Sequence, residues 1–180
     1  MAAEEGVLTH IVIPEGLNQD GSLSAYFEGC VREVARRAKA GDTVYVAPGN
    51  SFGHARVEDE VAAERLLALR PDVRVRWADA GRERYLDTLD NATELRRWAE
   101  REGMWPLAPC VLYCNRFHVA RVWFCFRLGG YRVHEVVGAS PVERRGQIVR
   151  RLWYYDFAVA NVIYEALALP YAALRRVGNA

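Results

Sequence analysis

Short apolar runs alternate with amphipathic stretches over most of the chain. The apolar runs have the length and the β-branched content of strands, and most of them are followed by a loop of small or polar residues. The predicted strands are residues 7–14, 43–47, 73–77, 109–114 and 131–137. Between them, apolar side chains recur at helical spacing. The predicted helices are residues 25–39, 58–69, 88–99 and 118–128.

This alternation predicts an α/β fold: a doubly wound, mostly parallel Rossmann-like sheet of about five strands flanked by helices. At 180 residues the chain suits a single domain, with its core over residues 7–138. Residues 144–169 then form one long helical pattern that Pro170 should end. We assign a C-terminal helical segment to residues 141–170, most of it covering the core. Its surplus of aromatic residues leaves a homodimer contact as the alternative.

Charge and cysteine content exclude several classes of protein. A formal net charge of +1 is too small to attract nucleic acid or an anionic membrane through a broad positive potential. The first ten residues, MAAEEGVLTH, lack a leader, and no window has the ~18 consecutive apolar residues of a membrane span. Cys30, Cys110, Cys114 and Cys125 form no C-x-x-C pair, so we interpret them as buried reduced thiols and assign no metal ligands. We expect a cytoplasmic protein without a membrane or nucleic-acid partner.

The most informative stretch is residues 109–121, PCVLYCNRFHVAR. An apolar strand turns polar at Asn115 and Arg116 and continues into a helix that carries His118 and Arg121. Residues three apart share a helix face, and ligands of open α/β sheets bind beyond the carboxyl ends of the strands. We therefore predict a ligand site at that edge. His118 would be its proton-transfer group, and Arg116 with Arg121 would clamp a phosphate, sulfate or carboxylate.

Other loops should deliver groups to the same edge, because the ends of parallel strands meet there. Gly16 and Gly49 follow the first two strands and would let the backbone approach a ligand. In the T-L-D-N-A opening of the third predicted helix, Asp90 could orient His118, hold a ribose hydroxyl or contact a metal, and Asn91 offers a donor and an acceptor. The candidate catalytic pair is His118 and Asp90. The candidate ligand-binding residues are Gly16, Asn18, Gly49, Asn50, Ser51, Glu60, Thr88, Asn91, Asn115, Arg116 and Arg121.

These motifs, in this order, resemble the YdcF/SanA/ElyC family of Rossmann-like domains of unknown function. That family has a Gly-bearing loop after its first strand, S-G-G after its second, a Glu-initiated helix, T-x-E-N, and a strand ending in T-S-x-x-H-x-x-R-A. The matching positions are Gly16, Pro48-Gly49, Glu60, Thr88 to Ala92 and Cys114 to Arg121. The resemblance spans residues 7–137. Many relatives carry N-terminal membrane segments, and we expect this chain to be a member without one. The resemblance implies a fold and a pocket more than a reaction.

The mixed polar set suits a small molecule with an anionic part and hydroxyl groups, such as a nucleotide or a sugar phosphate. We therefore expect an enzyme that acts on a phosphorylated or nucleotide-like small molecule by group transfer or hydrolysis. The alternative is a non-catalytic module that binds a nucleotide or S-adenosylmethionine. The cofactor stays open between none, S-adenosylmethionine and a divalent metal.

Each candidate also has a structural explanation. His118 could be an ordinary structural histidine, Arg121 could simply pair with Asp90 or Glu60, and Thr88 with Asp90 could only cap a helix. We interpret His10 as structural and His54 as either a mobile surface residue or a ligand. Packing explains the remaining large side chains. We expect burial of Phe126 and assign Trp77, Trp98, Trp123 and Trp153 to the core.

Overall fold

The computed structural model describes residues 8–78, 85–143 and 146–178. The first residue of the first predicted strand, most of the predicted connection 79–87 and the start of the C-terminal helical pattern at 144–145 lie outside these ranges.

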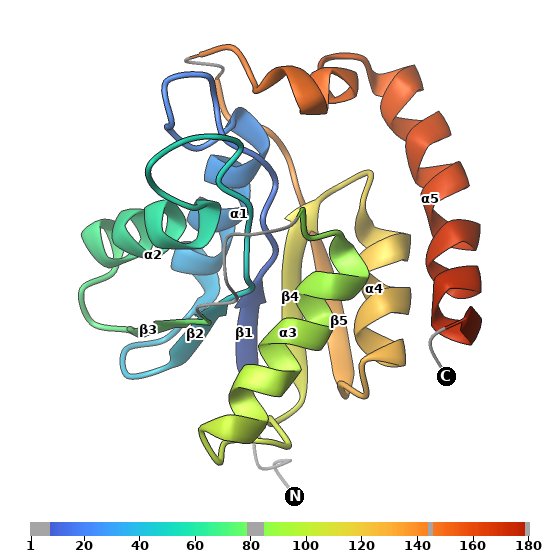
Figure 1. Cartoon of the computed structure of the whole chain (residues 1–180). Helices are drawn as coiled ribbons and strands as arrows, with labels where there is room; N and C mark the ends of the chain where they lie inside the picture. The colour runs from blue at the N-terminus through green and yellow to red at the C-terminus, as the bar shows by residue number, and fades with distance from the viewer. Residues whose placement is uncertain (1–7, 79–84, 144–145, 179–180) are drawn as a thin grey trace, which may run out of the picture.

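Five parallel strands form one sheet in the order β3-β2-β1-β4-β5 (Figure 1). The strands are β1 (Thr9–Val12), β2 (Thr43–Val46), β3 (Arg74–Trp77), β4 (Cys110–Asn115) and β5 (Val133–Ala139). The helices that connect them are α1 (Ala25–Arg37), α2 (Glu58–Leu69), α3 (Thr88–Arg101) and α4 (Val119–Leu128). The predicted doubly wound α/β fold is confirmed.

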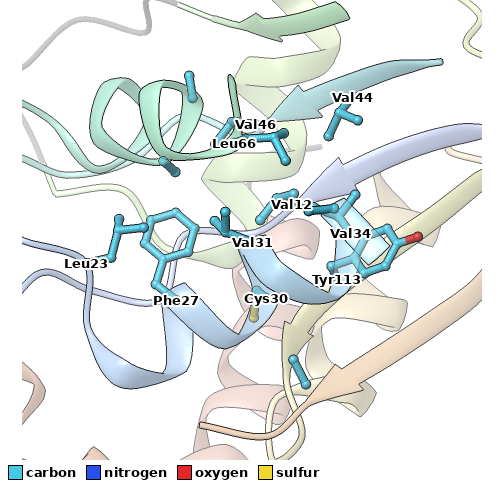
Figure 2. Close-up of a cluster of buried hydrophobic side chains, with 14 of the residues drawn as sticks. Val12, Leu23, Phe27, Cys30, Val31, Val34, Val44, Val46, Leu66 and Tyr113 are labelled. Carbon is cyan, nitrogen blue, oxygen red and sulfur yellow. The ribbon is translucent and has the colours of Figure 1, made fainter. Parts of the chain in front are cut away.

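Alternate side chains of the central strands enter two separate cores, because successive residues of a strand point to opposite faces of the sheet. Val12 joins the core under α1 and α2, where Figure 2 shows it near Val31 and Val34. Its neighbours Ile11 and Ile13 join the core under α3 and α4. The sheet is thus covered on both faces, and β1 and β4 are buried along their whole length.

The order of the strands places a crevice between β1 and β4. From β1 the chain moves to β2 and β3 on one side, and it then returns to β4 on the other side of β1. The loops that leave the carboxyl ends of β1 and β4 therefore diverge, and such a switch point is where open α/β sheets bind ligands.

The C-terminal segment passes over the carboxyl ends of the strands (Figure 1). It forms a 3-10 helix, Arg150–Asp156, and then α5 (Ala158–Gly178), which runs beside α4. The two are separated at Phe157, whose backbone is extended. The prediction that Pro170 ends the helix is wrong, because Pro170 lies inside α5. Both Pro170 and Ala166, whose carbonyl loses its partner, are exposed, so that carbonyl can bond to water.

Packing predictions had mixed outcomes. Phe126 is fully buried as predicted, and Trp98 packs against the same core. Trp77, Trp123 and Trp153 are 41%, 49% and 57% exposed, so their assignment to the core is wrong. Trp77 lies on the edge strand β3, and the two others lie on the outer sides of their helices, where Trp123 meets the guanidinium of Arg127.

The buried imidazole of His10, away from the crevice, is paired at both nitrogens. His10 Nδ1 lies 2.8 Å from the hydroxyl of Tyr113 and its Nε2 lies 3.3 Å from Asp42, which agrees with a structural role. All four cysteines are buried free thiols, as predicted. Among the described residues no helix combines the length and the apolar character needed to cross a membrane.

Candidate active site

A chain of hydrogen bonds joins three buried side chains at the switch point. Glu15 follows β1, His118 follows β4, and Thr88 is the first residue of α3. The Oε1 atom of Glu15 lies 2.8 Å from His118 Nδ1, and His118 Nε2 lies 2.9 Å from the Thr88 hydroxyl. This is an acid–histidine–hydroxyl chain built from three separate elements.

The donors around this chain determine where its protons lie. The guanidinium of Arg121 can only donate, and its Nη1 donates to Thr88 Oγ1 at 2.7 Å. The hydroxyl proton of Thr88 is therefore free to point at His118 Nε2. At the other end, Glu15 Oε1 also accepts from the backbone N–H of Asn115 at 2.8 Å. Because Glu15 Oε1 accepts from the Nδ1–H of His118, Nε2 is the ring nitrogen that can accept the hydroxyl proton of Thr88.

The carboxylate of Glu15 is held at its second oxygen as well. The Tyr155 hydroxyl, from the 3-10 helix, donates to Oε2 at 2.6 Å. The C-terminal segment therefore helps to fix the acid that orients His118.

Arg121 is tied to the C-terminal helix. Its Nε and Nη2 atoms donate to the two carboxylate oxygens of Glu165 at 2.7 and 2.8 Å. Burial opposes the charge of Arg121, but Glu165 more than offsets this and raises the pKa of Arg121 above its ordinary value.

A second buried acid, Glu58, begins α2 beside this chain. Its Oε1 accepts from the N–H of Gly16 at 2.6 Å and its Oε2 from the N–H of Asn50 at 2.7 Å. Burial raises the pKa of Glu58 to about 8, although these N–H donors oppose the rise. Gly49 lets the loop approach the acid, since a Cβ there would lie 2.5 Å from Glu58 Cβ.

Two adjoining cavities open onto these groups. The inner one, of about 30 Å³, is lined by Glu15, Glu58 and His118, and the outer one, of about 400 Å³, by Asp90, Cys125 and residues of α5. Both are lined by Tyr85, Asp87, Thr88, Arg121 and Tyr164. Thr88 and Arg121 therefore lie where the small polar chamber meets the larger one.

The structure brings together about half of the residues predicted for the site. Those that line the inner cavity are Gly16, Asn50, Thr88, Asn91, His118 and Arg121. Asp90 lines the outer cavity. Asn18, Gly49, Ser51, Glu60, Asn115 and Arg116 line neither.

Four of the residues outside the cavities hold backbone in place. Asn18 donates to Ser22 and to the carbonyl of Leu23, and the Asn115 side chain accepts from the N–H of Phe117. Ser51 accepts from the N–H of Gly53 in a turn, and Glu60 reaches back to the N–H of Val57. The acid of the second helix that lines the inner cavity is thus Glu58, two residues before the one predicted.

Of the three roles considered for Asp90, the orienting of His118 belongs to Glu15 in the structure. Asp90 accepts from the backbone N–H of Asp87 in a reciprocal cap of α3, at 3.2 Å. The imidazole of His118 is instead held between Glu15 and Thr88.

The predicted arginine clamp is not formed. Arg116 is exposed, with its guanidinium 4.8 Å from the centre of the Phe117 ring, and Arg121 is paired with Glu165. The alternative in which Arg121 pairs with Asp90 or Glu60 is also wrong, because the partner comes from α5. The described residues contain no group of His, Cys, Asp and Glu placed to bind a metal ion.

Comparison with known proteins adds no assignment of family. No family model matches the chain, and no curated protein matches it. Among solved structures, the chain is similar to E. coli tRNA N6-threonylcarbamoyladenosine dehydratase, TcdA, with 12% identity and a TM-score of 0.30. That alignment covers 97% of this chain and 87% of the other. A likeness at this level indicates nothing about activity.

Proposed function

We propose that this protein is an enzyme that acts on a nucleotide-like or phosphorylated small molecule, by group transfer or hydrolysis, at the carboxyl edge of the sheet. The observation that carries the proposal is the chain from Glu15 through His118 to Thr88, which ends at a cavity of about 400 Å³. Nucleophile and base within hydrogen-bond reach, with the base oriented by a third group, is the arrangement that activates a hydroxyl.

His118 is the proton-transfer group of this proposal. Its Nε2 contacts the Thr88 hydroxyl and its Nδ1 contacts Glu15, so Nε2 can accept a proton and the carboxylate can stabilise the imidazolium that results. Tyr155 and the Asn115 N–H hold Glu15 in that orientation.

The substrate class is supported by the place and the walls of the cavity. The inner cavity, lined by Glu15 and His118, lies at the switch point where doubly wound sheets bind nucleotides, and the volume of the adjoining outer cavity falls in the usual range of small-molecule sites. Tyr85, Tyr164 and Tyr171 line it and offer ring faces to a base and hydroxyls to a sugar. A phosphate at Arg121 would compete with Glu165, so the nucleoside part is the better supported half of the proposal.

The YdcF-like family and the cytoplasmic location belong to the same proposal. The family is supported by the positions that the motifs share, since Gly16, Thr88, Asn91, His118 and Arg121 line one cavity. S-adenosylmethionine and a divalent metal remain cofactors to be tested.

A binding assay with a cavity-filling variant tests the substrate class. Ala168 lines the outer cavity, whereas Ala166 of the same helix is exposed. We expect nucleosides, nucleotides, sugar phosphates or S-adenosylmethionine to raise the Tm of the wild type and of Ala166→Trp, but not of Ala168→Trp. Equal shifts in both variants, or no shift with any of these ligands, would contradict the site.

One observation favours the non-catalytic alternative. The inner cavity of about 30 Å³ leaves little space beside His118 for more than a water-sized group. To distinguish the two functions, wild type and His118→Gln are incubated with a ligand that raises the Tm, and conversion of the ligand is followed by mass spectrometry. If the protein is an enzyme, wild type should convert the ligand and His118→Gln should bind it without converting it. If it is a binding module, neither protein should convert the ligand.

A further inference from the structure

We infer that Thr88 is the nucleophile of this site, and that the group it accepts is the acyl group of an ester or amide carried by the substrate. The inference rests on the proposed function, because it names the reacting residue and the reacting group of the same site.

The hydroxyl of Thr88 is not needed for the helix that it begins. The N-terminal amides of α3 are capped by Asp87, whose Oδ1 accepts from the N–H of Leu89 at 2.9 Å and of Asp90 at 3.0 Å. The Thr88 hydroxyl points instead to His118 and Arg121. A threonine that served only as a cap would make the bonds that Asp87 already makes.

The surroundings of Thr88 favour its alkoxide. His118 Nε2, at 2.9 Å, can remove the hydroxyl proton, and the charge of Arg121, whose Nη1 lies 2.7 Å away, stabilises the negative oxygen that remains. A buried site strengthens both effects, since Thr88 is only 3% exposed. Thr88 lines both cavities, so a ligand bound in the outer cavity would lie beside it.

The charges nearby favour an acyl group over a phosphoryl group. The carboxylates of Glu15 and Glu165 hold His118 and Arg121, the two residues that contact Thr88, and Arg121, the one buried arginine among the described residues, already pairs with Glu165. Bringing a phosphoryl dianion among these carboxylates would cost more than bringing a neutral carbonyl.

The reaction then proceeds in two balanced steps. Thr88 Oγ1 bonds to the carbonyl carbon, its proton moves to His118 Nε2, and the bond from that carbon to the leaving group breaks as the leaving group takes the proton. Water next gives a proton to Nε2 and adds to the acyl-threonine carbonyl. The Thr88 oxygen leaves and regains the proton.

An alkyl β-lactone tests this inference, because ring opening by a nucleophilic hydroxyl leaves the whole probe attached as an ester. We expect the full chain to gain the mass of one lactone, located by peptide mapping at Thr88. Thr88→Ser should retain the label, Thr88→Val should lose it, and His118→Gln should be labelled about 10²-fold or more slowly. The matched control is Thr93→Val: Thr93 lies in the same helix and bonds the carbonyl of Leu89, so this variant should label as wild type.

Labelling that persists in Thr88→Val, an adduct on any other residue, or unlabelled wild type and Thr88→Ser would overturn the inference. If Thr88→Val does not fold, peptide mapping of the adduct in wild type and in Thr88→Ser still tests whether residue 88 is labelled. The proposed function can survive such a failure: conversion of a bound nucleotide-like ligand that needs His118 but not Thr88 would mean that His118 activates water. Conversely, a labelled Thr88 in a protein that binds none of the tested ligands would leave the nucleophile in place and reject the substrate class.

Discussion

Glu165 of α5 and Arg121 of α4 form a bidentate ion pair, with N–O distances of 2.7 and 2.8 Å, beside the candidate active site. Both side chains are largely buried, with 8% of Arg121 and 11% of Glu165 exposed. The pair therefore fastens the C-terminal helix to the wall of the cavity and, at the same time, positions the guanidinium that donates to Thr88.

Removing one partner of this pair should destabilise the protein strongly. Glu165→Ala leaves the charge of Arg121 buried and uncompensated, and we expect a loss of about 3–5 kcal/mol in the free energy of unfolding, measured by urea denaturation. The control is the exposed pair of Arg56 and Glu64, at 2.8 Å, where Glu64→Ala should cost at most about 1 kcal/mol. Similar losses in both variants would show that the buried pair has no special role in holding α5.

Local sequence could indicate only those site residues that lie within a recognisable short motif. His118 and Arg121 could be found because they share a helix face after a buried strand, and Thr88 because it opens a helix with a capping pattern. The partners of these residues could not. Glu15 is separated from His118 by 103 positions, and Glu165 from Arg121 by 44, so nothing local links them. Only the switch point between β1 and β4 makes the first pair neighbours.

The wrong predictions about side-chain burial and about the end of α5 also have physical reasons. The apolar pattern of α4 identifies a helix but does not decide which of its large residues face the sheet, so Phe126 is buried and Trp123 is not. Pro170 was expected to end its helix because it lacks an N–H. On an exposed helix, however, water can replace that single bond. The sheet itself was predictable, because its alternating elements depend on composition and spacing alone.

Glu58 should make the stability of the protein depend on pH. Its pKa in the folded protein is about 8, against an ordinary value of 4.5. Between these values the folded state holds a proton that the unfolded state has released, so the free energy of unfolding should fall as pH rises from 4.5 to 8. We expect the Tm of wild type to fall more over this range than that of Glu58→Gln, which cannot ionise. Parallel profiles of Tm against pH would mean that Glu58 ionises normally.

The outer face of α5 allows a test of the alternative in which the C-terminal segment forms a homodimer contact. Val159, Leu167 and Leu174 are among its exposed apolar residues, each at least 70% exposed. A patch of this kind favours association with another surface of the same kind. We expect sedimentation to detect a dimer of wild type that Leu167→Glu converts to monomer. The control is Leu67→Glu, on the exposed side of α2, which should leave the dimer intact. A wild-type monomer at all concentrations would reject the dimer.

Tyr155 should matter for reactivity as well as for stability. Its hydroxyl donates to Glu15 Oε2 at 2.6 Å, and Tyr155→Phe leaves that buried oxygen without this donor. The matched control is Tyr131→Phe, which removes a buried hydroxyl that donates to the carbonyl of Ala92 at 3.0 Å, in the other core. Tyr155→Phe should lose about 1–3 kcal/mol in urea denaturation, because it leaves Glu15 Oε2 without its donor, whereas Tyr131→Phe should lose less, because the Ala92 carbonyl keeps its bond within α3. Only Tyr155→Phe should also slow the lactone labelling of Thr88, since a less firmly held Glu15 orients His118 less well. Equal labelling rates in the two variants would mean that the Asn115 N–H alone holds Glu15 in place.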